Sequence, residues 1–191
     1  MIDIVTHFLL IKIIYSLYQK LINTKHMNQA HLHMVINHFP IVGIIIGMIV
    51  LGVGIAAKSA LSKRIGCLIL IGSSLFTFPS FETGEGAEEI VENLPGISEI
   101  FIEKHEEIAE QFMGFVWAII LIGVLTLISE WKMKKFINWL YISLFVISVF
   151  ATYFAKQVGT SGGEIRHTEI RKTNAKEETQ NENKEKEHEE H

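Results

Sequence analysis

Residues 31–54, HLHMVINHFPIVGIIIGMIVLGVG, join a segment with three histidines to a long apolar run, and this stretch decides the fold. Seventeen consecutive residues, Ile41 to Ala57, carry no charged side chain. With the His-Phe-Pro segment before it, the run reaches the ~20 residues that an α-helix needs to cross a hydrocarbon core of ~30 Å. We therefore predict a membrane-spanning helix with metal-capable polar side chains at one end.

Three more apolar runs follow the first one. The 191-residue chain is 49% hydrophobic and its mean hydropathy is +0.30, which is too apolar for a soluble domain of this size. In all four runs, Asp, Glu, Lys, Arg and His occur only at the outer ends, where His38 and Glu110 lie. The pattern predicts an all-α fold, a four-helix transmembrane bundle over residues 28–170 in the lipid bilayer, with spans at 36–57, 65–81, 109–129 and 136–155.

Residues 1–26 form a separate N-terminal segment. Its polar side chains fall on one helical face, at Lys12, Ser16, Gln19, Lys20 and Asn23. Lys12 would lie in mid-bilayer in a spanning helix, at a cost of about 2.5–3.5 kcal/mol. We therefore predict an amphipathic helix at the membrane surface. The alternatives are a fifth span, or a natural start at Met27 that makes the segment an N-terminal extension.

Residues 171–191 form a charged tail. Thr173–His191 contains three Lys and seven Glu, so it carries the whole formal net charge of −4 and leaves the rest of the chain neutral. A segment so poor in apolar side chains is predicted to be disordered. Because the remaining charge is balanced, composition gives no indication of nucleic-acid binding, and we expect no nucleic acid among the partners.

Local signals predict where the helices begin and bend. Asn28 and Ser98 are suitable N-cap residues for the first and third long helices. Pro40 either kinks the first helix close to His38 or starts it, with Phe39 as the N-cap. In both cases, His38 is expected at a backbone irregularity.

Glycines are expected to act in two ways. Gly43 and Gly47 form a G-x-x-x-G pattern, with Gly54 seven residues further on, which lets a neighbouring helix approach closely. Elsewhere glycines predict turns, one at residues 84–86 and one at residues 159–163.

The loops predict an orientation. Residues 58–64 and 130–135 carry six basic side chains and one acid, whereas residues 82–107 carry nine Glu and one Lys. The positive-inside rule places the two basic loops in the cytoplasm. We therefore expect a multi-pass protein of the bacterial inner membrane, with its His- and Glu-rich side facing the periplasm or exterior.

A helical rise of ~1.5 Å per residue brings polar side chains from all four spans to the outer boundary of the membrane. His31 and His38, seven residues apart, are expected to share one helical face, and His33 to point elsewhere. The predicted cofactor ligands are His38, His105 and His167. For a metal ion, Glu82 and Glu106 are added to these three histidines.

Imidazole and carboxylate ligands suit a transition-metal ion such as Zn, Fe, Mn or Cu. Two histidines on facing helices also suit a six-coordinate haem b. The one cysteine, Cys67, excludes a Cys-based cluster and an intramolecular disulfide. The sequence contains no zinc-finger spacing, HExxH, phosphate-binding loop or dinucleotide fingerprint.

Several short motifs lie between residues 28 and 170: Asn37-His38-Phe39-Pro40, Thr83-Gly84-Glu85, Ala87-Glu88-Glu89, Leu94-Pro95-Gly96, His105-Glu106 and Gly162-Gly163-Glu164-Ile165-Arg166-His167. They resemble those of a group of small, uncharacterised bacterial four-span membrane proteins, which implies the fold but no activity. Histidines in a four-span bundle give a looser similarity to haem-binding membrane cytochromes. Cytochromes that pass electrons across the bilayer carry histidines at two depths, and here the cytoplasmic halves of the spans have none.

Two functions are compatible with these features, and neither establishes an enzyme. One is a redox module with a haem or metal at the outer boundary, exchanging electrons with quinone or another membrane protein. The other is a non-catalytic membrane protein with a structural or partner-binding role. A transporter is disfavoured, because the span interiors lack the ionisable side chains that mark transport paths.

Overall fold

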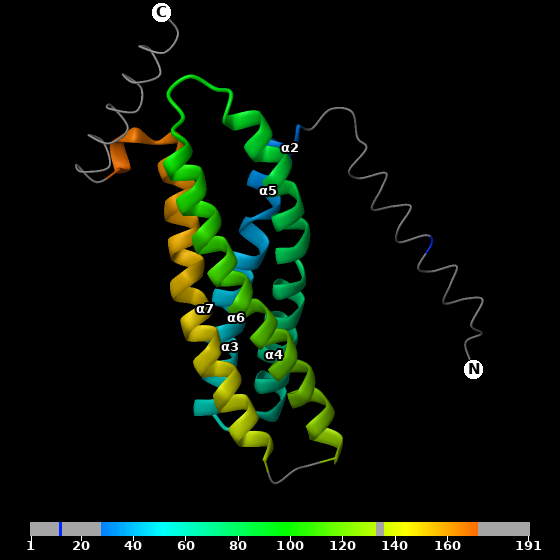
Figure 1. The fold of residues 1–191 in the computed structure, drawn as a ribbon. Coiled ribbons are helices and arrows are strands. Elements are labelled where there is room, and N and C mark those ends of the chain that lie inside the picture. Colours follow the sequence, from blue (N-terminus) through cyan, green and yellow to red (C-terminus); the bar gives the residue numbers. More distant parts are fainter. Residues whose placement is uncertain (1–11, 13–27, 133–135, 172–191) are drawn as a thin grey trace, which may run out of the picture.

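The computed structural model describes Lys12, residues 28–132 and residues 136–171, and all regular structure in that part is helical (Figure 1). The elements are α2 (Gln29–Ile36), α3 (His38–Ala56), α4 (Ala60–Leu75), α5 (Thr77–Val91), α6 (Glu99–Lys132), α7 (Ile137–Arg166) and the short 3₁₀ helix η1 (Thr168–Ile170). Apart from Lys12, the predicted amphipathic helix at residues 1–26 lies outside the described residues, as does the predicted disorder beyond Arg171.

Four helical stretches are long and apolar enough to cross a membrane: Gln29–Ala56, Ala60–Val91, Glu99–Glu130 and Ile137–Arg166. They run alternately up and down, with the connections after α3 and α6 at one end and the connection between α5 and α6 at the other (Figure 1). Large apolar side chains cover the outside, among them Val42, Ile46, Ile49 and Val53 along one face of α3. The predicted all-α bundle of four membrane-length helices is confirmed.

The first two long helices are each broken at a similar level. The break between α2 and α3 is at Asn37, and the break between α4 and α5 is at Phe76. Each break precedes a proline by three residues, Pro40 and Pro79, because proline cannot donate the backbone hydrogen bond of a helix interior. The rings of Phe39 and Phe76 stack with centroids 5.2 Å apart, so the two breaks lie side by side. His38 lies at a backbone irregularity, as predicted, but Phe39 is inside α3 and is not its N-cap.

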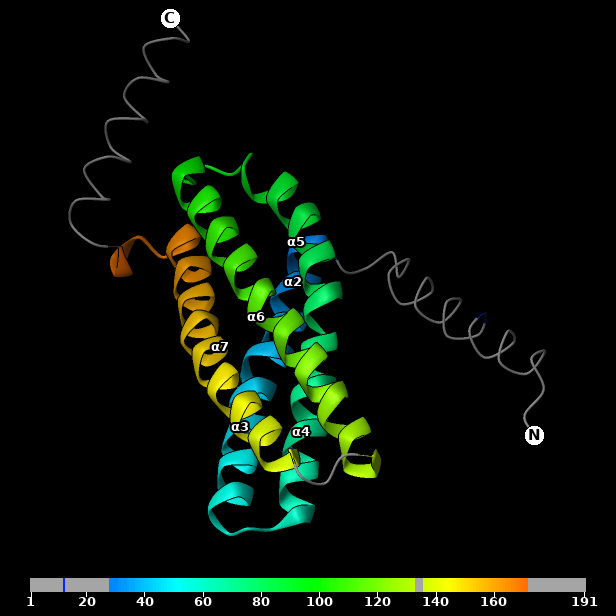
Figure 2. The same ribbon diagram turned by 60° about the horizontal axis from the view of Figure 1, so that its bottom comes forward.

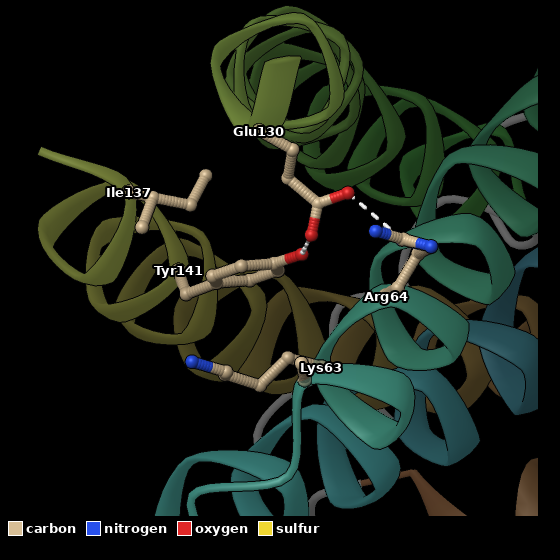
Figure 3. A pocket seen from close by; sticks show the side chains of 6 residues that line it. Lys63, Arg64, Glu130, Ile137 and Tyr141 are labelled. Atoms are coloured by element: carbon tan, nitrogen blue, oxygen red, sulfur yellow. Dashed lines mark hydrogen bonds and ion pairs between the residues drawn. The ribbon is translucent and has the colours of Figure 1, made fainter. Parts of the chain in front are cut away.

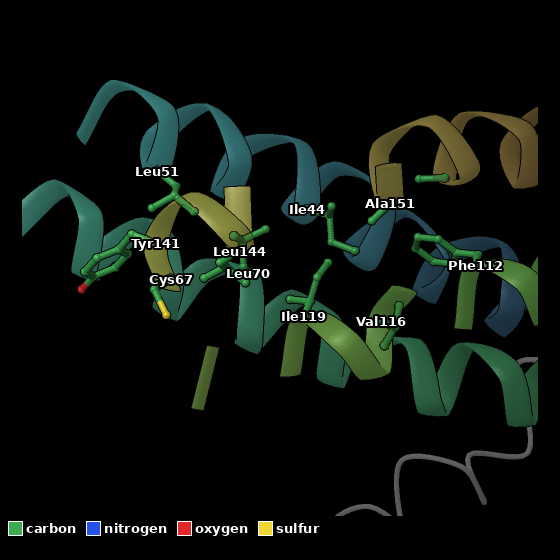
Figure 4. Close-up of a cluster of buried hydrophobic side chains, with 11 residues drawn as sticks. Ile44, Leu51, Cys67, Leu70, Phe112, Val116, Ile119, Tyr141, Leu144 and Ala151 are labelled. Atoms are coloured by element: carbon green, nitrogen blue, oxygen red, sulfur yellow. The ribbon is translucent and has the colours of Figure 1, made fainter. Parts of the chain in front are cut away.

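Below the breaks, the four helices enclose an apolar core (Figure 4). Ile44 and Leu51 of α3, Leu70 of α4 and Leu144 of α7 are completely buried. Cys67 is also buried, and its thiol lies 3.5 Å from the carbonyl oxygen of Gly123. The other members of the core are Phe112, Val116, Ile119, Tyr141, Ala151 and Ala155.

Glycines bring α3 and α4 into close contact. A methyl group on Gly54 would lie 2.6 Å from the backbone nitrogen of Lys63, and one on Gly66 would lie 2.5 Å from that of Leu51. At Gly47 it would meet the Leu70 side chain at 2.8 Å. The close approach predicted from the glycine spacing is therefore confirmed, and it allows the van der Waals packing that holds helices together in lipid.

The helices extend further than the sequence predicted. Residues 84–86 were expected to form a turn, but Gly84 and Gly86 lie inside α5. Residues 159–163 were also expected to turn, but α7 continues without interruption to Arg166. Both turn predictions are wrong. These glycines lie inside helices, where the missing side chain allows another helix to pack closely. A methyl group at Gly86 would meet the Gln29 side chain, and one at Gly162 would meet the His105 ring.

After α7 the chain folds back through η1 to Arg171, which is only 5% exposed. Its guanidinium donates to the carbonyl oxygens of Glu164 (2.7 Å) and Ile165 (2.8 Å) and lies 4.0 Å from the centroid of the Phe101 ring. Burial lowers the pKa of Arg171, whereas the Glu164 carboxylate opposes that shift. The folded part therefore includes Arg171, one residue beyond the predicted boundary.

Candidate functional site

Above the breaks, the helices form two pairs, α2 with α5 and α6 with α7 (Figure 2). Each pair is joined by many contacts, whereas α5 and α6 make few. His33 of α2 and His105 of α6 connect the two pairs: their ring centroids are 6.4 Å apart, with the ring planes at 85°. This histidine pair is the candidate functional site.

His33 is held against α5. Its Nδ1 lies 2.9 Å from the carbonyl oxygen of Ser80, and because a carbonyl can only accept, Nδ1 carries the proton. The hydroxyl of Thr83, directed to the Pro79 and Ser80 carbonyls, lies 3.5 Å from the same nitrogen. Nε2 of His33 is therefore the nitrogen with the free lone pair, which is the form of a neutral imidazole that binds a metal.

His105 is held against α7 in a similar way. Its Nδ1 lies 3.0 Å from the hydroxyl oxygen of Ser161, and that hydroxyl donates its own hydrogen to the Val158 carbonyl at 3.1 Å. The Ser161 oxygen thus accepts from Nδ1 of His105, which leaves Nε2 with the lone pair. Both rings are half-buried, and a glycine faces each one: Gly84 lies against His33 and Gly162 against His105.

The structure separates the three histidines that were predicted as ligands. His105 belongs to the pair, but His38 is exposed and its Nδ1 lies 2.6 Å from the carbonyl oxygen of Met34 in the last turn of α2. His167 is exposed beside Glu169, at 2.9 Å. His33 points away from the exposed face of His31 and His38, as predicted, but it is this ring, and not His38, that faces His105.

The two predicted carboxylates also lie apart from the pair. Glu82 is exposed on α5. Glu106 is exposed on α6, within hydrogen-bonding reach of Glu88. Within the described residues, no group of three or more His, Cys, Asp or Glu side chains is placed to hold a metal ion. A metal at the histidine pair would therefore take two ligands from these side chains.

The site was assigned to His38 because the sequence does not show which face of the first helix points to the bundle. His31 and His38, seven residues apart, are both exposed, so they share a face that points away from the site. A signal for His33 was present in the small residues opposite it. Ser80, Thr83 and Gly84 leave room on α5 for a ring, but this signal can be recognised only when α5 is known to face α2.

Three buried oxygens at the level of the breaks have no hydrogen-bond partner among the described residues: Asn37 Oδ1, Ser74 Oγ and Thr77 Oγ1. Other hydroxyls in the spans donate to a carbonyl one turn earlier, as Thr126 does to Ile122 and Thr152 to Ser148. Ser74 and Thr77 thus lack the hydrogen bond to an earlier carbonyl that usually satisfies a Ser or Thr hydroxyl in a helix.

No family model, curated protein or solved structure matches this chain. The similarity of its motifs to those of small bacterial four-span membrane proteins stays a prediction. The length and composition of the four long helices indicate a multi-pass membrane protein.

Proposed function

We propose that this protein binds one haem between α2 and α6, with His33 and His105 as its two axial ligands, and that it transfers electrons at the outer end of the bundle. The observation that carries this proposal is the pair of facing imidazoles. Each has its Nδ1 occupied by a protein oxygen, and each keeps the Nε2 lone pair.

The number of ligands favours haem over a bare metal ion. A porphyrin supplies four nitrogens itself, so two axial histidines complete six-coordination. A structural zinc site usually takes four protein ligands, and no group of three is present in the described part of the chain. The donor set therefore fits haem b better than the transition-metal ion that the sequence also allowed.

The distance between the rings is compatible with axial ligation. Nitrogen–metal bonds of imidazole are about 2.0–2.1 Å long. Two such bonds plus the half-widths of two rings give a centroid separation comparable to the 6.4 Å between His33 and His105. Few backbone contacts join α5 to α6, so α6 is attached less closely to α5 than to α7.

The surrounding residues have positioning roles in this proposal. The Ser80 carbonyl and the Ser161 hydroxyl fix the tautomer of each ring, and such partners also make an imidazole a better ligand. Gly84 and Gly162 make room for the rings themselves, since a methyl group at either glycine would contact the ring that it faces. The haem would exchange electrons with quinone or another membrane protein, on the periplasmic side of the inner membrane.

Absorption spectroscopy of the detergent-purified protein tests the proposal. We expect a Soret band and one haem per chain, both lost in His33→Ala and in His105→Ala. His31→Ala is the matched control, because His31 lies two residues away on α2 and is exposed. His38→Ala should also retain the haem. Loss of the Soret band in His38→Ala but not in His33→Ala would overturn the assignment.

One observation favours the second candidate, a structural or partner-binding membrane protein. Both rings already have hydrogen-bond partners on the adjacent helix, so the pair can join α2/α5 to α6/α7 without a cofactor. A colourless, metal-free protein that unfolds more easily when His33 or His105 is replaced would support this role.

A further inference from the structure

The opposite end of the bundle contains a polar pocket of about 260 Å³ between the start of α4, the end of α6 and the start of α7 (Figure 3). It is lined by Ala60, Lys63, Arg64, Glu130, Ile137 and Tyr141. This is the end where α3 connects to α4, opposite the end where α5 connects to α6 (Figure 1). Its side chains have no part in the proposed haem site.

The carboxylate in this pocket is already neutralised. Arg64 Nε donates to one oxygen of Glu130 at 2.8 Å, and the Tyr141 hydroxyl donates to the other at 2.6 Å (Figure 3). Glu130 is 12% exposed at its side chain, whereas Arg64 is 53% exposed. The guanidinium therefore keeps donors that face the outside, because only one of its five N–H groups is used by Glu130.

Lys63 adds a positive charge that is not neutralised. Its ammonium donates to the amide oxygen of Asn138 at 3.0 Å and lies 5.1 Å from the centroid of the Tyr141 ring. Both partners are uncharged, and no described carboxylate forms an ion pair with Lys63. Lys63 and Arg64 also lie in the first turns of α4, where the helix dipole disfavours cations and favours a bound anion. The pocket thus has an excess positive charge.

Large apolar side chains are exposed on the same turns of α4 and α7 as the pocket residues. On α4, Leu61 is 67% exposed, and Ile65 also points outward. On α7, Trp139 is 69% exposed and Ile142 is exposed as well. Tryptophan is enriched where the hydrocarbon core meets the headgroups. A molecule bound here would meet cations with its polar end and exposed apolar side chains with the rest.

We propose that this pocket binds the phosphate of an anionic membrane lipid, with Lys63 and Arg64 as donors and the acyl chains against the apolar side chains of α4 and α7. Basic pockets between membrane helices are suited to anionic headgroups. Cations beside the exposed apolar sides of two membrane-length helices favour a lipid over a free anion, which would use the cations alone.

Native mass spectrometry of the delipidated full-length protein in a non-ionic detergent tests this proposal. The probes are dioleoyl phosphatidylglycerol, dioleoyl phosphatidylcholine and inorganic phosphate at equal concentrations. We expect one phosphatidylglycerol per chain, and at least about fivefold weaker binding of phosphatidylcholine and of phosphate. Lys63→Gln should weaken phosphatidylglycerol binding about fivefold, the factor expected for removing one surface cation.

Two variants separate binding from folding. Lys63→Arg keeps the charge and should retain the lipid, and Lys156→Gln, an exposed lysine at the opposite end, should bind as the wild type does. The Tm of each variant without lipid reports whether it is folded. Equal affinity for phosphatidylglycerol and phosphatidylcholine would overturn the proposal, as would a folded Lys63→Gln with unchanged binding. Inorganic phosphate binding as tightly as phosphatidylglycerol would also overturn it, since it would assign the pocket to a soluble anion.

Discussion

The lower and upper halves of this bundle are held together by different means. Below the breaks at Asn37 and Phe76, glycines bring α3 against α4, and an apolar core joins all four helices. Above the breaks, α2/α5 and α6/α7 are separate pairs that meet at His33 and His105. In lipid, close packing of small and apolar residues is the usual source of helix association. The upper half replaces part of that packing by polar side chains, and such a region is where function is expected.

The two prolines and the unpaired buried oxygens lie at the boundary between the apolar lower half and the more polar upper half. Pro40 and Pro79 each deprive a helix of one backbone hydrogen bond. Asn37, Ser74 and Thr77 have unpaired side-chain oxygens at the same level. Unpaired buried polar atoms lower stability, so the boundary between the halves is less tightly held than the apolar core below it.

The largest expected effect concerns the compartments that the two halves face. Fusions of a reporter at residue 61 should give a cytoplasmic signal, and fusions at residue 90 an external one, because the basic side chains lie at the lower end. Paired reporters, one active only inside and one only outside, measure this as an all-or-none difference. The reverse pattern would move the histidine pair to the cytoplasm.

Packing in the lower half is tested by Gly66→Ala. The added methyl group would lie 2.5 Å from the Leu51 backbone nitrogen, so α3 and α4 must separate, and we expect the free energy of unfolding to fall by about 2–3 kcal/mol. Gly72→Ala on the same helix is the matched control, since nothing lies within 4 Å of the new methyl. Denaturant unfolding in detergent measures both. Equal free energies of unfolding for Gly66→Ala and Gly72→Ala would contradict the role of close contact between α3 and α4.

The stability of the upper half should depend on Arg171, where the chain has folded back after α7. Arg171→Ala removes two hydrogen bonds to carbonyls and the contact with Phe101, and we expect a loss of about 2 kcal/mol. Arg166→Ala, at an exposed arginine of α7, should change the stability little. A chain ending at Lys172 should be as stable as the full chain, whereas a chain ending at Ile170 should resemble Arg171→Ala.

The smallest effect is expected at the lower polar pocket. Tyr141→Phe removes one hydrogen bond to Glu130 but leaves Arg64 in place, so the loss should be about 1 kcal/mol. Tyr153→Phe is the control on α7, because Tyr153 is 60% exposed. A loss as large as that of Gly66→Ala would show that the polar cluster, and not packing, stabilises the lower half.

The sequence was sufficient for the features that depend on neighbours in the chain. Apolar runs predicted four spans, Asn28 predicted a helix start, and its side chain does accept from the His31 backbone nitrogen at 2.8 Å. α6 begins directly after Ser98, as expected. These features follow from local hydrogen bonding and hydropathy, so they do not require knowledge of the partners in space.

Glycine was ambiguous for a physical reason. It favours turns because it lacks a side chain, and it favours close helix packing for the same reason. At Gly43 and Gly47 the surrounding apolar run indicated packing correctly, whereas at Gly84 and Gly162 the polar neighbours suggested turns. Only the structure shows that these two glycines face the rings of His33 and His105.

Which face of the first helix points to the bundle could not be predicted from the sequence. His31 and His38 lie on the exposed face, whereas His33, on another face of α2, meets His105. The seven-residue spacing indicated the shared face but not its direction, because apolar residues occur on all sides of this helix. His105, predicted as a ligand, does face α2.

The length of α6 has an electrical consequence. His105 lies 25 residues above Glu130, which corresponds to about 37 Å along the helix, whereas the hydrocarbon core is only ~30 Å thick. The membrane voltage falls almost entirely across that core, and moving one elementary charge through all of it involves about 2.3 kcal/mol per 100 mV. With the proposed haem at the histidine pair, an electron that reaches it from the adjoining aqueous phase would cross little of this field. Its transfer would therefore respond to the potential of its donor and hardly to the energised state of the membrane.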